Sequence, residues 1–223
     1  MSIAATFGAG GAEPYATALR ANRPIVMMLH GTDGDGGRAL PMDVKRWNAH
    51  ADAADLSLLR SATGPLLDIG CGPGRMVRAA MDMGLDVLGV DVSPTAIDIA
   101  RAEGLSVIER SVFDRLPAEG QWQTVLLVDG NVGIGGDVRA MLVRCLELLA
   151  PSGEIVVELH PDPATHSSYS ARVIGENGGH SEVFPWAEIG LEPLVGIAAE
   201  LGLVARQSWE VDGRAFCRLV TTR

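Results

Sequence analysis

Residues 66–75 read Leu-Leu-Asp-Ile-Gly-Cys-Gly-Pro-Gly-Arg, an apolar run that leads into a turn crowded with glycine. We name residues 70–74 the first glycine loop. Glycine at Gly70, Gly72 and Gly74 lets the backbone turn sharply, and it lets a ligand lie against main-chain N–H groups without meeting Cβ atoms. The helix expected after the turn would direct its positive N-terminal end at that ligand. The stretch therefore predicts a ligand site between a strand and a helix.

An acidic residue follows at a distance typical of nucleotide sites. Asp91 stands at the tip of the next predicted strand, residues 86–90. In dinucleotide-binding folds, an acidic residue about 20 positions beyond the glycine motif hydrogen-bonds to the ribose. The first glycine loop and Asp91 together indicate a ligand that contains adenosine.

An NAD(P)-dependent oxidoreductase is the obvious alternative owner of such a loop. Its fingerprint is Gly-x-Gly-x-x-Gly, in which the third glycine allows the helix to pack on the strand. This chain has Gly-x-Gly-x-Gly, with Pro73 inside it and Arg75 where that third glycine belongs. Asp68, inside the strand, is unfavourable beside a pyrophosphate but favourable beside an ammonium group. Both features favour a different adenosine-containing cofactor.

Strands and helices alternate through the rest of the chain. Ser93-Pro94 provides an N-cap and a first-position proline for the helix after the second strand. The chain closes with two strands, 203–211 and 214–221, joined by the turn pair Asp212-Gly213. Helices alternate with predicted strands at 65–69, 86–90, 106–109, 124–128 and 154–159. We therefore expect an α/β fold: a Rossmann-like, doubly wound, mostly parallel seven-stranded sheet with an antiparallel terminal hairpin.

The N-terminal part differs from this alternation. Helical spacing appears over 42–60, and Glu13-Pro14 favours a short helix through about Ala21. We expect residues 1–60 to form an N-terminal helical cap and 61–223 to form the Rossmann-like cofactor-binding domain. The segment 160–186 carries no clear period.

Bulk properties narrow the class of protein. A net charge of −10 and a pI near 4.9, with Lys45 as the only lysine, argue against a nucleic-acid partner. The three cysteines form no CxxC pair, no secretion signal is apparent, and no apolar stretch is long enough to span a bilayer. We expect a cytoplasmic protein without a membrane partner. The oligomeric state does not follow from the sequence.

The stretch LLDIGCGPGR, with Val-Asp-Val-Ser at 90–93, closely resembles the first two motifs of class I S-adenosylmethionine-dependent methyltransferases. The resemblance covers about 60–160 by motif and 60–223 by the order of the elements. It implies S-adenosylmethionine as the cofactor and a small molecule as the methyl acceptor. The chain also looks like a bacterial small-molecule subgroup of that family.

The family pattern implies a set of cofactor contacts. Asp68 and the first glycine loop would hold the methionine part, Asp91 the ribose, and the end of the third strand the adenine. Trp47, on the helix before the first strand, would cover the cofactor, although its spacing suits a core tryptophan equally well. The implied residues are Asp68, Gly70, Cys71, Gly72, Pro73, Gly74, Asp91, Val92, Ser111, Val112, Phe113 and Trp47.

A second glycine loop, Val-Asp-Gly-Asn-Val-Gly-Ile-Gly-Gly-Asp at 128–137, follows the fourth strand. The carboxyl ends of parallel strands are where ligands gather in doubly wound folds. We expect Asp129, Gly130 and Asn131 to contact the cofactor, with Asp129 also a candidate catalytic base. Asp137 is more simply explained as a helix N-cap.

His160 is the other candidate base, because histidine titrates near neutral pH. It opens the segment His-Pro-Asp-Pro-Ala-Thr-His at 160–166, which has too few ligands for a predicted metal site. A structural role for His160 remains open. A cofactor-binding protein without transfer activity, and an NAD(P)-dependent oxidoreductase, are the alternatives to a methyltransferase.

Overall fold

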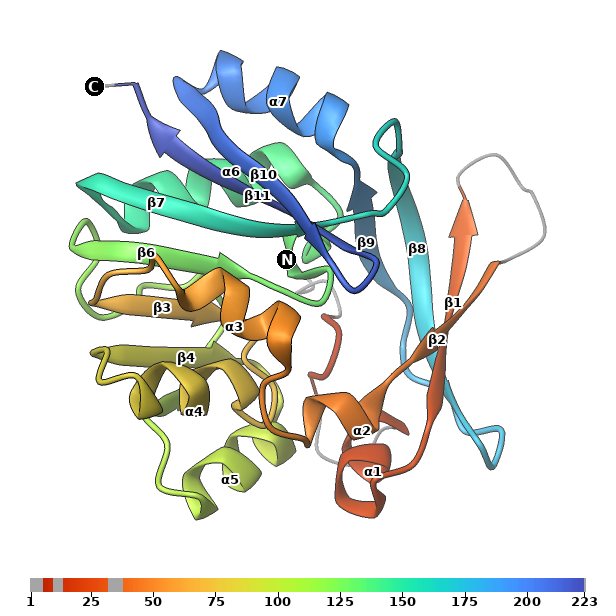
Figure 1. Ribbon diagram of the computed structural model, residues 1–223. Helices are drawn as coiled ribbons and strands as arrows, with labels where there is room; N and C mark the ends of the chain where they lie inside the picture. The colour runs from red at the N-terminus through yellow and green to blue at the C-terminus, as the bar shows by residue number, and fades with distance from the viewer. Residues whose placement is uncertain (1–5, 10–13, 32–37, 223) are drawn as a thin grey trace.

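A computed structural model describes residues 6–9, 14–31 and 38–222 of the chain. Its larger sheet has seven strands in the order β10-β11-β7-β6-β3-β4-β5 (Figure 1). The five strands from β7 to β5 in this order pair in parallel with their neighbours. β11 pairs antiparallel with both β7 and β10. The strands are β3 (Leu66–Ile69), β4 (Val87–Asp91), β5 (Val107–Glu109), β6 (Trp122–Leu127), β7 (Leu149–Leu159), β10 (Leu203–Val211) and β11 (Arg214–Thr221). The predicted Rossmann-like sheet with its terminal hairpin is confirmed.

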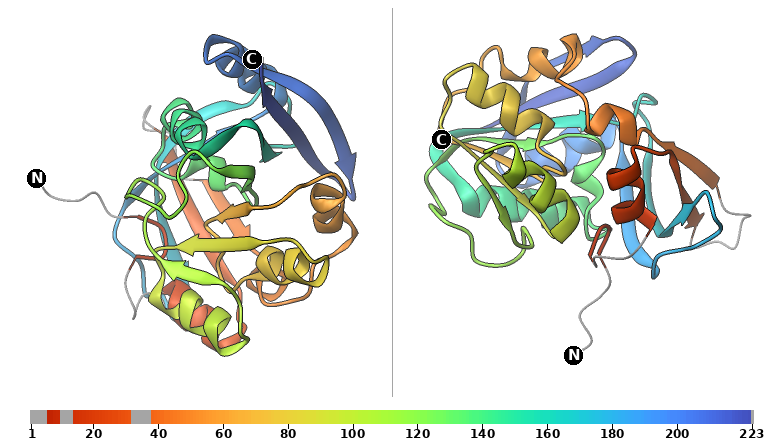
Figure 2. Two further views of the ribbon diagram at one scale, coloured as in Figure 1. Left: turned by 90° about the vertical axis from the view of Figure 1, so that its left-hand side faces the viewer. Right: turned by 90° about the horizontal axis from the view of Figure 1, so that it is seen from below.

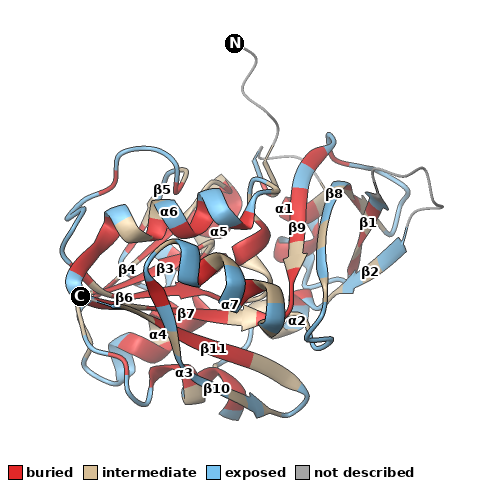
Figure 3. Cartoon of the chain, turned by 90° about the horizontal axis from the view of Figure 1, so that it is seen from above, coloured by how far each residue is buried: buried red, intermediate tan, exposed pale blue. Residues whose placement is uncertain are grey.

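Helices pack on both faces of this sheet and bury two apolar layers. One layer lies under α3 (Ala53–Leu59), α4 (Arg75–Asp82) and α5 (Pro94–Ala102), and the other under α6 (Val138–Leu148) and α7 (Leu191–Glu200). Figure 3 shows the buried residues concentrated on the strands and on the helix faces that cover them. The two-sided burial explains why β3 reads as an unbroken apolar run interrupted only by Asp68.

A second, antiparallel sheet in the order β2-β1-β8-β9 stands beside the first (Figures 1 and 2). Its strands are β1 (Ile25–Gly31), β2 (Arg38–Met42), β8 (His166–Gly175) and β9 (Phe184–Ile189). Together with α1 (Pro14–Ala21) and α2 (Val44–Trp47), it forms a layer that we name the cap. An apolar cluster that includes Tyr15, Met27 and Trp186 holds the cap together.

The cap corrects the sequence analysis in two respects. The N-terminal segment has helices, as expected, but it also contributes β1 and β2, and its expected long helix is divided into α2 and α3. The segment 160–186, which had no readable period, forms β8 and the first half of β9. One face of β8 is largely exposed to solvent and carries Ser168 and Ser170. Apolar and polar residues therefore alternate only weakly along this strand.

The helices of the described residues are all short. None of them is long and apolar enough to cross a bilayer.

Candidate functional site

A pocket with about 870 Å³ of empty space, part of it open to solvent, lies between the cap and the carboxyl ends of β3, β4 and β6. Most of the residues singled out in the sequence line it. These are Trp47, Asp68, Gly70, Cys71, Gly72, Pro73, Asp91, Val92, Ser111, Val112, Asp129 and Asn131. The fold therefore brings both glycine loops and the acidic residues between them to one cavity.

The first glycine loop is locked onto Asp91. Gly70 and Gly72 have φ of 68° and 54°, in the region that favours glycine. The Gly72 N–H and the Ser93 N–H each donate a hydrogen bond of 2.8 Å to a different oxygen of Asp91. Burial raises the pKa of Asp91, and these backbone hydrogen bonds act against the rise. Each oxygen keeps acceptor capacity for a ligand, because a carboxylate can accept about four hydrogen bonds.

Asp68 is the most unusual group in the pocket. Its side chain is buried, and Oδ2 has no hydrogen-bond partner among the described residues. Burial raises the pKa of Asp68 to about 8; Arg75 opposes the rise and the carboxylates of Asp129 and Asp91 add to it. A buried acceptor without a partner is unfavourable in a folded protein unless a ligand supplies the partner. A cationic group in the pocket would do so.

The second glycine loop makes a different use of its glycines. Gly133 lies in the short 3₁₀ helix η1 (Asn131–Gly133), and a Cβ atom there would stand 1.9 Å from the carbonyl oxygen of Ala187 on β9. A Cβ atom on Gly136 would meet Pro185 Cβ at 2.8 Å. These glycines allow β9 of the cap to pack directly on the loop. They hold the cap in place, and no phosphate site is needed to explain them.

Asn131 joins the two loops. Its Nδ2 atom donates hydrogen bonds to the carbonyls of Ile69, at 2.7 Å, and Gly70, at 3.0 Å. Both amide hydrogens are therefore engaged by the protein, and a contact to a cofactor would have to use Oδ1.

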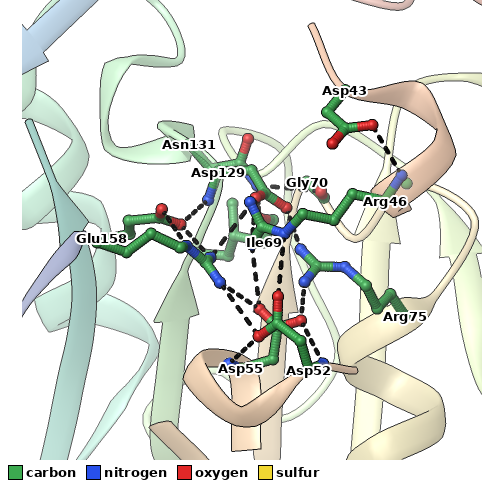
Figure 4. A network of polar contacts seen from close by, with 12 residues as sticks. Asp43, Arg46, Asp52, Asp55, Ile69, Gly70, Arg75, Asp129, Asn131 and Glu158 are labelled. Atoms are coloured by element: carbon green, nitrogen blue, oxygen red, sulfur yellow. Dashed lines mark hydrogen bonds and ion pairs between the residues drawn. The ribbon is translucent and has the colours of Figure 1, made fainter. Parts of the chain in front are cut away.

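Asp129 belongs to a network of arginines and carboxylates beside the pocket (Figure 4). Its carboxylate forms ion pairs with Arg75 and, at 3.2 Å, with Arg46. Its N–H donates to Glu158 at 2.7 Å. Burial and Glu158 raise the pKa of Asp129, and Arg75, Arg46 and Arg214 act against the rise. A carboxylate held in this way is poorly suited to act as a free base.

The same network continues below the pocket to Asp55, which is fully buried on α3. Arg75 pairs with Asp55, and Arg214 pairs with it at 2.8 Å while donating two hydrogen bonds of 2.7 Å to Glu158. Burial raises the pKa of Asp55, but the hydrogen bonds from Arg75 and Arg214 and the charge of Arg75 outweigh it and hold the pKa below its usual value. Sequence analysis missed this network. Its one readable signal is a charged residue, Asp55, at an apolar position of a helix.

The carboxylates of this network are not arranged as a metal site. Within the part of the chain that the structure describes, no group of three or more His, Cys, Asp and Glu side chains is arranged to hold a metal ion.

The cap supplies an aromatic side to the pocket that the sequence analysis only partly identified. Trp47 lines the pocket and also packs into the apolar cluster of the cap, so both of its expected roles agree with its position. Tyr15, Met42 and Trp186 of the cap also line it, together with Thr6 and Phe7 from the segment 6–9 that packs on the cap.

Four of the expected site residues are not brought to the pocket lining. Gly74 has φ of 92°, and a Cβ atom there would lie 2.4 Å from Leu105, so this glycine serves packing. Phe113 is 48% exposed and lies beyond Ser111 and Val112. Gly130 precedes η1 with φ of 83°, and its position faces the Trp186 ring.

The fourth is His160, which was expected to be a catalytic base. Its Nδ1 atom accepts a hydrogen bond from the Asp162 N–H at 3.1 Å and lies 2.9 Å from the Thr165 hydroxyl. These local bonds shape the turn that leads into β8, and they support the structural alternative. Asp137 accepts a hydrogen bond from the Ala140 N–H at 3.0 Å, which confirms that it is a helix N-cap.

Known proteins match the part of the chain that contains both glycine loops. The family model described as a methyltransferase domain matches residues 66–153. A ubiquinone biosynthesis O-methyltransferase of Cereibacter sphaeroides is 34% identical over 116 residues, which are 49% of this chain and 46% of that protein. The chain thus spans about half the length of the curated relatives it matches.

Solved structures extend the likeness to the whole fold. An S-adenosylmethionine-dependent methyltransferase from Bacteroides fragilis, crystallised with S-adenosylhomocysteine, superposes with a TM-score of 0.71 at 19% identity and covers 93% of each chain. The 1,6-didemethyltoxoflavin-N1-methyltransferase of Burkholderia thailandensis gives 0.58 at 17% identity, covering 79% of this chain and 81% of that one. Residues 66–153, which carry the first glycine loop and Asp91, thus match a methyltransferase domain, and the fold is shared with solved S-adenosylmethionine-dependent methyltransferases.

Proposed function

We propose that this protein transfers a methyl group from S-adenosylmethionine to a small-molecule acceptor. The observation that carries the proposal is the pair of carboxylates in the pocket: Asp91, fixed by the first glycine loop, and Asp68, whose Oδ2 atom lacks a partner. A ligand with ribose hydroxyls at one end and an ammonium group at the other satisfies both.

The residues present fit this cofactor. We assign the ribose hydroxyls to Asp91, the ammonium group to Asp68, and the adenine to the wall formed by Ser111 and Val112. The left-handed backbone of Gly70 and Gly72 leaves room for the ligand against the main chain. When bound, S-adenosylmethionine supplies a methyl group on a sulfonium, which an acceptor nucleophile can displace directly.

The chain itself contributes alignment and the exclusion of water. In-line displacement is accelerated when nucleophile and electrophilic carbon are held at contact distance in a desolvated site. The aromatic side of the cap covers the pocket, and β9 is fixed on the second glycine loop at Gly133 and Gly136. We propose that this contact sets the distance between the acceptor and the cofactor.

Oxygen is the methylated atom that we favour, because the curated relatives are O-methyltransferases. Asp129 is held by Arg46 and Arg75, and His160 lies outside the pocket lining. A hydroxyl that is more acidic than that of an alcohol loses its proton with less help from a base, and it therefore suits such a site better.

Calorimetric titration of the full chain with S-adenosylmethionine, S-adenosylhomocysteine and NAD⁺ tests the assignment. We expect the first two to bind and NAD⁺ to bind far more weakly; tighter binding of NAD⁺ would overturn the proposal. Transfer of labelled methyl to a panel of hydroxyl and amine compounds tests activity. Tight cofactor binding with no transfer to any of them would favour a binding protein without transfer activity.

A further inference from the structure

Phe7 occupies a central position in the aromatic part of the cap. Its ring contacts four other rings, and the distances between ring centroids lie in the range of favourable aromatic pairs, about 4.5–7 Å. The distances are 4.7 Å to Tyr15, 5.6 Å to Phe184, 5.9 Å to Trp186 and 6.5 Å to Trp47. Tyr15 also contacts Trp47, and Phe184 contacts Trp186, so Phe7 is the ring that touches both pairs.

Phe7 reaches this position from a segment of its own. It lies in residues 6–9, outside the helices and strands of the cap, and the Ala9 N–H closes a turn within that segment by donating to the Thr6 carbonyl. Phe7 and Thr6 both line the pocket. The surrounding rings come from α1, α2 and β9, which are fixed by the core of the cap. Aromatic side chains held by the core of the cap thus surround Phe7, which comes from a separate short segment.

This aromatic cluster lies directly on the two glycine loops. A Cβ atom on Gly72 would stand 3.4 Å from the Tyr15 hydroxyl oxygen, and one on Gly130 would stand 3.4 Å from Trp186. The cluster is therefore next to the part of the pocket where the two glycine loops meet. An acceptor placed there would be adjacent to the cofactor.

The charge of this subsite is set by its walls. Phe7, Tyr15, Trp47 and Trp186, with Met42 and Ile134, carry no formal charge at neutral pH, and all of them line the pocket. Asp129 is neutralised by its ion pairs with Arg46 and Arg75. Such walls favour an uncharged, flat, apolar ligand over an anion or a strongly hydrated cation.

We infer that Phe7 fills the acceptor subsite, and that an uncharged aromatic ring of the acceptor displaces Phe7 and stacks against Trp186, Trp47 and Tyr15. The inference rests on the proposed function and adds to it the chemical class of the acceptor. Phe7 is then a specificity-determining residue that competes with the acceptor, and Trp186 is one that binds it.

Binding of 1-naphthol to the full chain saturated with S-adenosylhomocysteine tests this inference. The matched probe is decahydro-1-naphthol, which has the same carbon skeleton without the aromatic rings. We expect 1-naphthol to bind on the order of tenfold more tightly, since each aromatic pair adds a preference beyond the burial of area. Tetramethylammonium serves as the cationic probe, because aromatic cages also bind quaternary ammonium groups. Equal binding of the two naphthol probes, or tighter binding of tetramethylammonium, would overturn the inference.

Two variants separate a competing ring from a supporting wall. Phe7→Ala should tighten the binding of 1-naphthol several-fold, because no side chain has to be displaced, and Phe7→Leu should fall between the two. Trp186→Ala should weaken it several-fold. Weaker binding in Phe7→Ala would show that Phe7 is a wall of the subsite, and the inference would be wrong.

The control variant is Val204→Ala, since Val204 is exposed on β10 and is absent from the pocket lining. It should leave 1-naphthol binding unchanged. The affinity for S-adenosylhomocysteine reports on folding and on the cofactor site in every variant. If wild-type protein fails to bind S-adenosylhomocysteine, the proposed function falls, and this inference with it. If it binds S-adenosylhomocysteine but not 1-naphthol, only this inference falls.

Discussion

Asn131 lies against Gly70 and ties the second glycine loop to the first: its Nδ2 atom donates a hydrogen bond of 3.0 Å to the Gly70 carbonyl and another of 2.7 Å to the neighbouring Ile69 carbonyl. The two loops follow different strands, yet they form one wall of the pocket. Substitutions that displace Asn131 or Gly70 from this contact should therefore affect the same ligand.

The first prediction concerns Gly70→Ala. The new Cβ atom would stand 2.6 Å from Asn131 Nδ2, and alanine is disfavoured at a φ of 68°. We expect the affinity for S-adenosylhomocysteine, measured by calorimetry, to fall at least about tenfold, because the loop must shift. Gly104→Ala is the matched control: its φ is 74°, and a Cβ atom there would meet nothing within 4 Å. It should lose stability but bind the ligand normally, and equal losses of affinity in both variants would contradict the argument.

Asp68 gives a prediction for the pH dependence of binding. Burial raises its pKa to about 8, so the carboxyl is mostly protonated at pH 6.5 in the free protein. An ammonium group favours the ionised form, and binding must then release a proton. From pH 6 to 7.5 we expect the affinity for S-adenosylhomocysteine to rise by up to about tenfold per pH unit. Asp68→Asn should remove the rise. Proton release is measured by calorimetry in buffers of different ionisation enthalpy, and its absence in wild type would sink the assignment of Asp68.

The same group affects the stability of the unliganded protein with the opposite trend. A carboxyl whose pKa is raised on folding binds its proton more tightly in the native state. Its contribution to stability is full below the unfolded pKa, near 4, and is lost as the pH rises toward about 8. Relative to Asp68→Asn, the wild-type free energy of unfolding should therefore decline between pH 5 and 8, by at most about 1.4 kcal/mol per pH unit. Urea denaturation of both proteins across this range provides the measurement, and parallel pH profiles would show that Asp68 is ionised throughout.

Much of the main sheet could be predicted from sequence because its signals are local. Buried parallel strands read as apolar runs, and caps such as Ser93-Pro94 and Asp137 mark the helix starts. The sequence spacing from Gly70 to Asp91 also predicted a real contact, because Asp91 accepts a hydrogen bond from the Gly72 N–H of the first glycine loop.

The cap and the ion pairs could not be predicted because their signals are not local. β8 pairs with β1 across more than half of the chain, and no pattern in either strand names the partner. Arg46 and Asp129 are far apart in the sequence, and only the tertiary fold brings them within 3.2 Å of each other. Phe7 and Trp186 are likewise brought to the pocket lining only by the tertiary fold.

Arg75 provides a prediction about stability. Its side chain is buried between Asp55 and Asp129, and Arg75→Met would leave the fully buried Asp55 with Arg214 and Arg46 but without its Arg75 contact. Removing one partner of a buried ion pair costs about 3–5 kcal/mol. We expect a loss of that order in the free energy of unfolding at pH 7.

The control for Arg75 is Arg139→Met, which removes an exposed pair with Glu200 and should cost less than about 1 kcal/mol. Asp55 also sets a limit in acid. Because its pKa is lowered by Arg75 and Arg214 despite burial, its contribution is present above pH 4 and is lost as the pH falls below that value. Similar losses of unfolding free energy in Arg75→Met and Arg139→Met would mean that the buried network adds nothing beyond a surface ion pair.

The last prediction joins the second glycine loop to catalysis. A Cβ atom on Gly133 would lie 1.9 Å from the Ala187 carbonyl oxygen, so Gly133→Ala must push β9 away from the loop. Trp186 is the neighbour of Ala187 on β9 and lines the pocket, so it should move with the strand. The cofactor side of the pocket is built on β3 and β4 and should remain in place. We therefore expect the rate of methyl transfer at saturating cofactor to fall at least about tenfold while the Kd for S-adenosylhomocysteine changes less than about twofold. Gly84→Ala, in the turn between α4 and β4 with no atom within 4 Å of its Cβ position, is the control and should preserve both quantities. A variant that loses cofactor affinity and turnover together would show that the second glycine loop supports the cofactor itself, and that its contact with β9 does not separately position the acceptor.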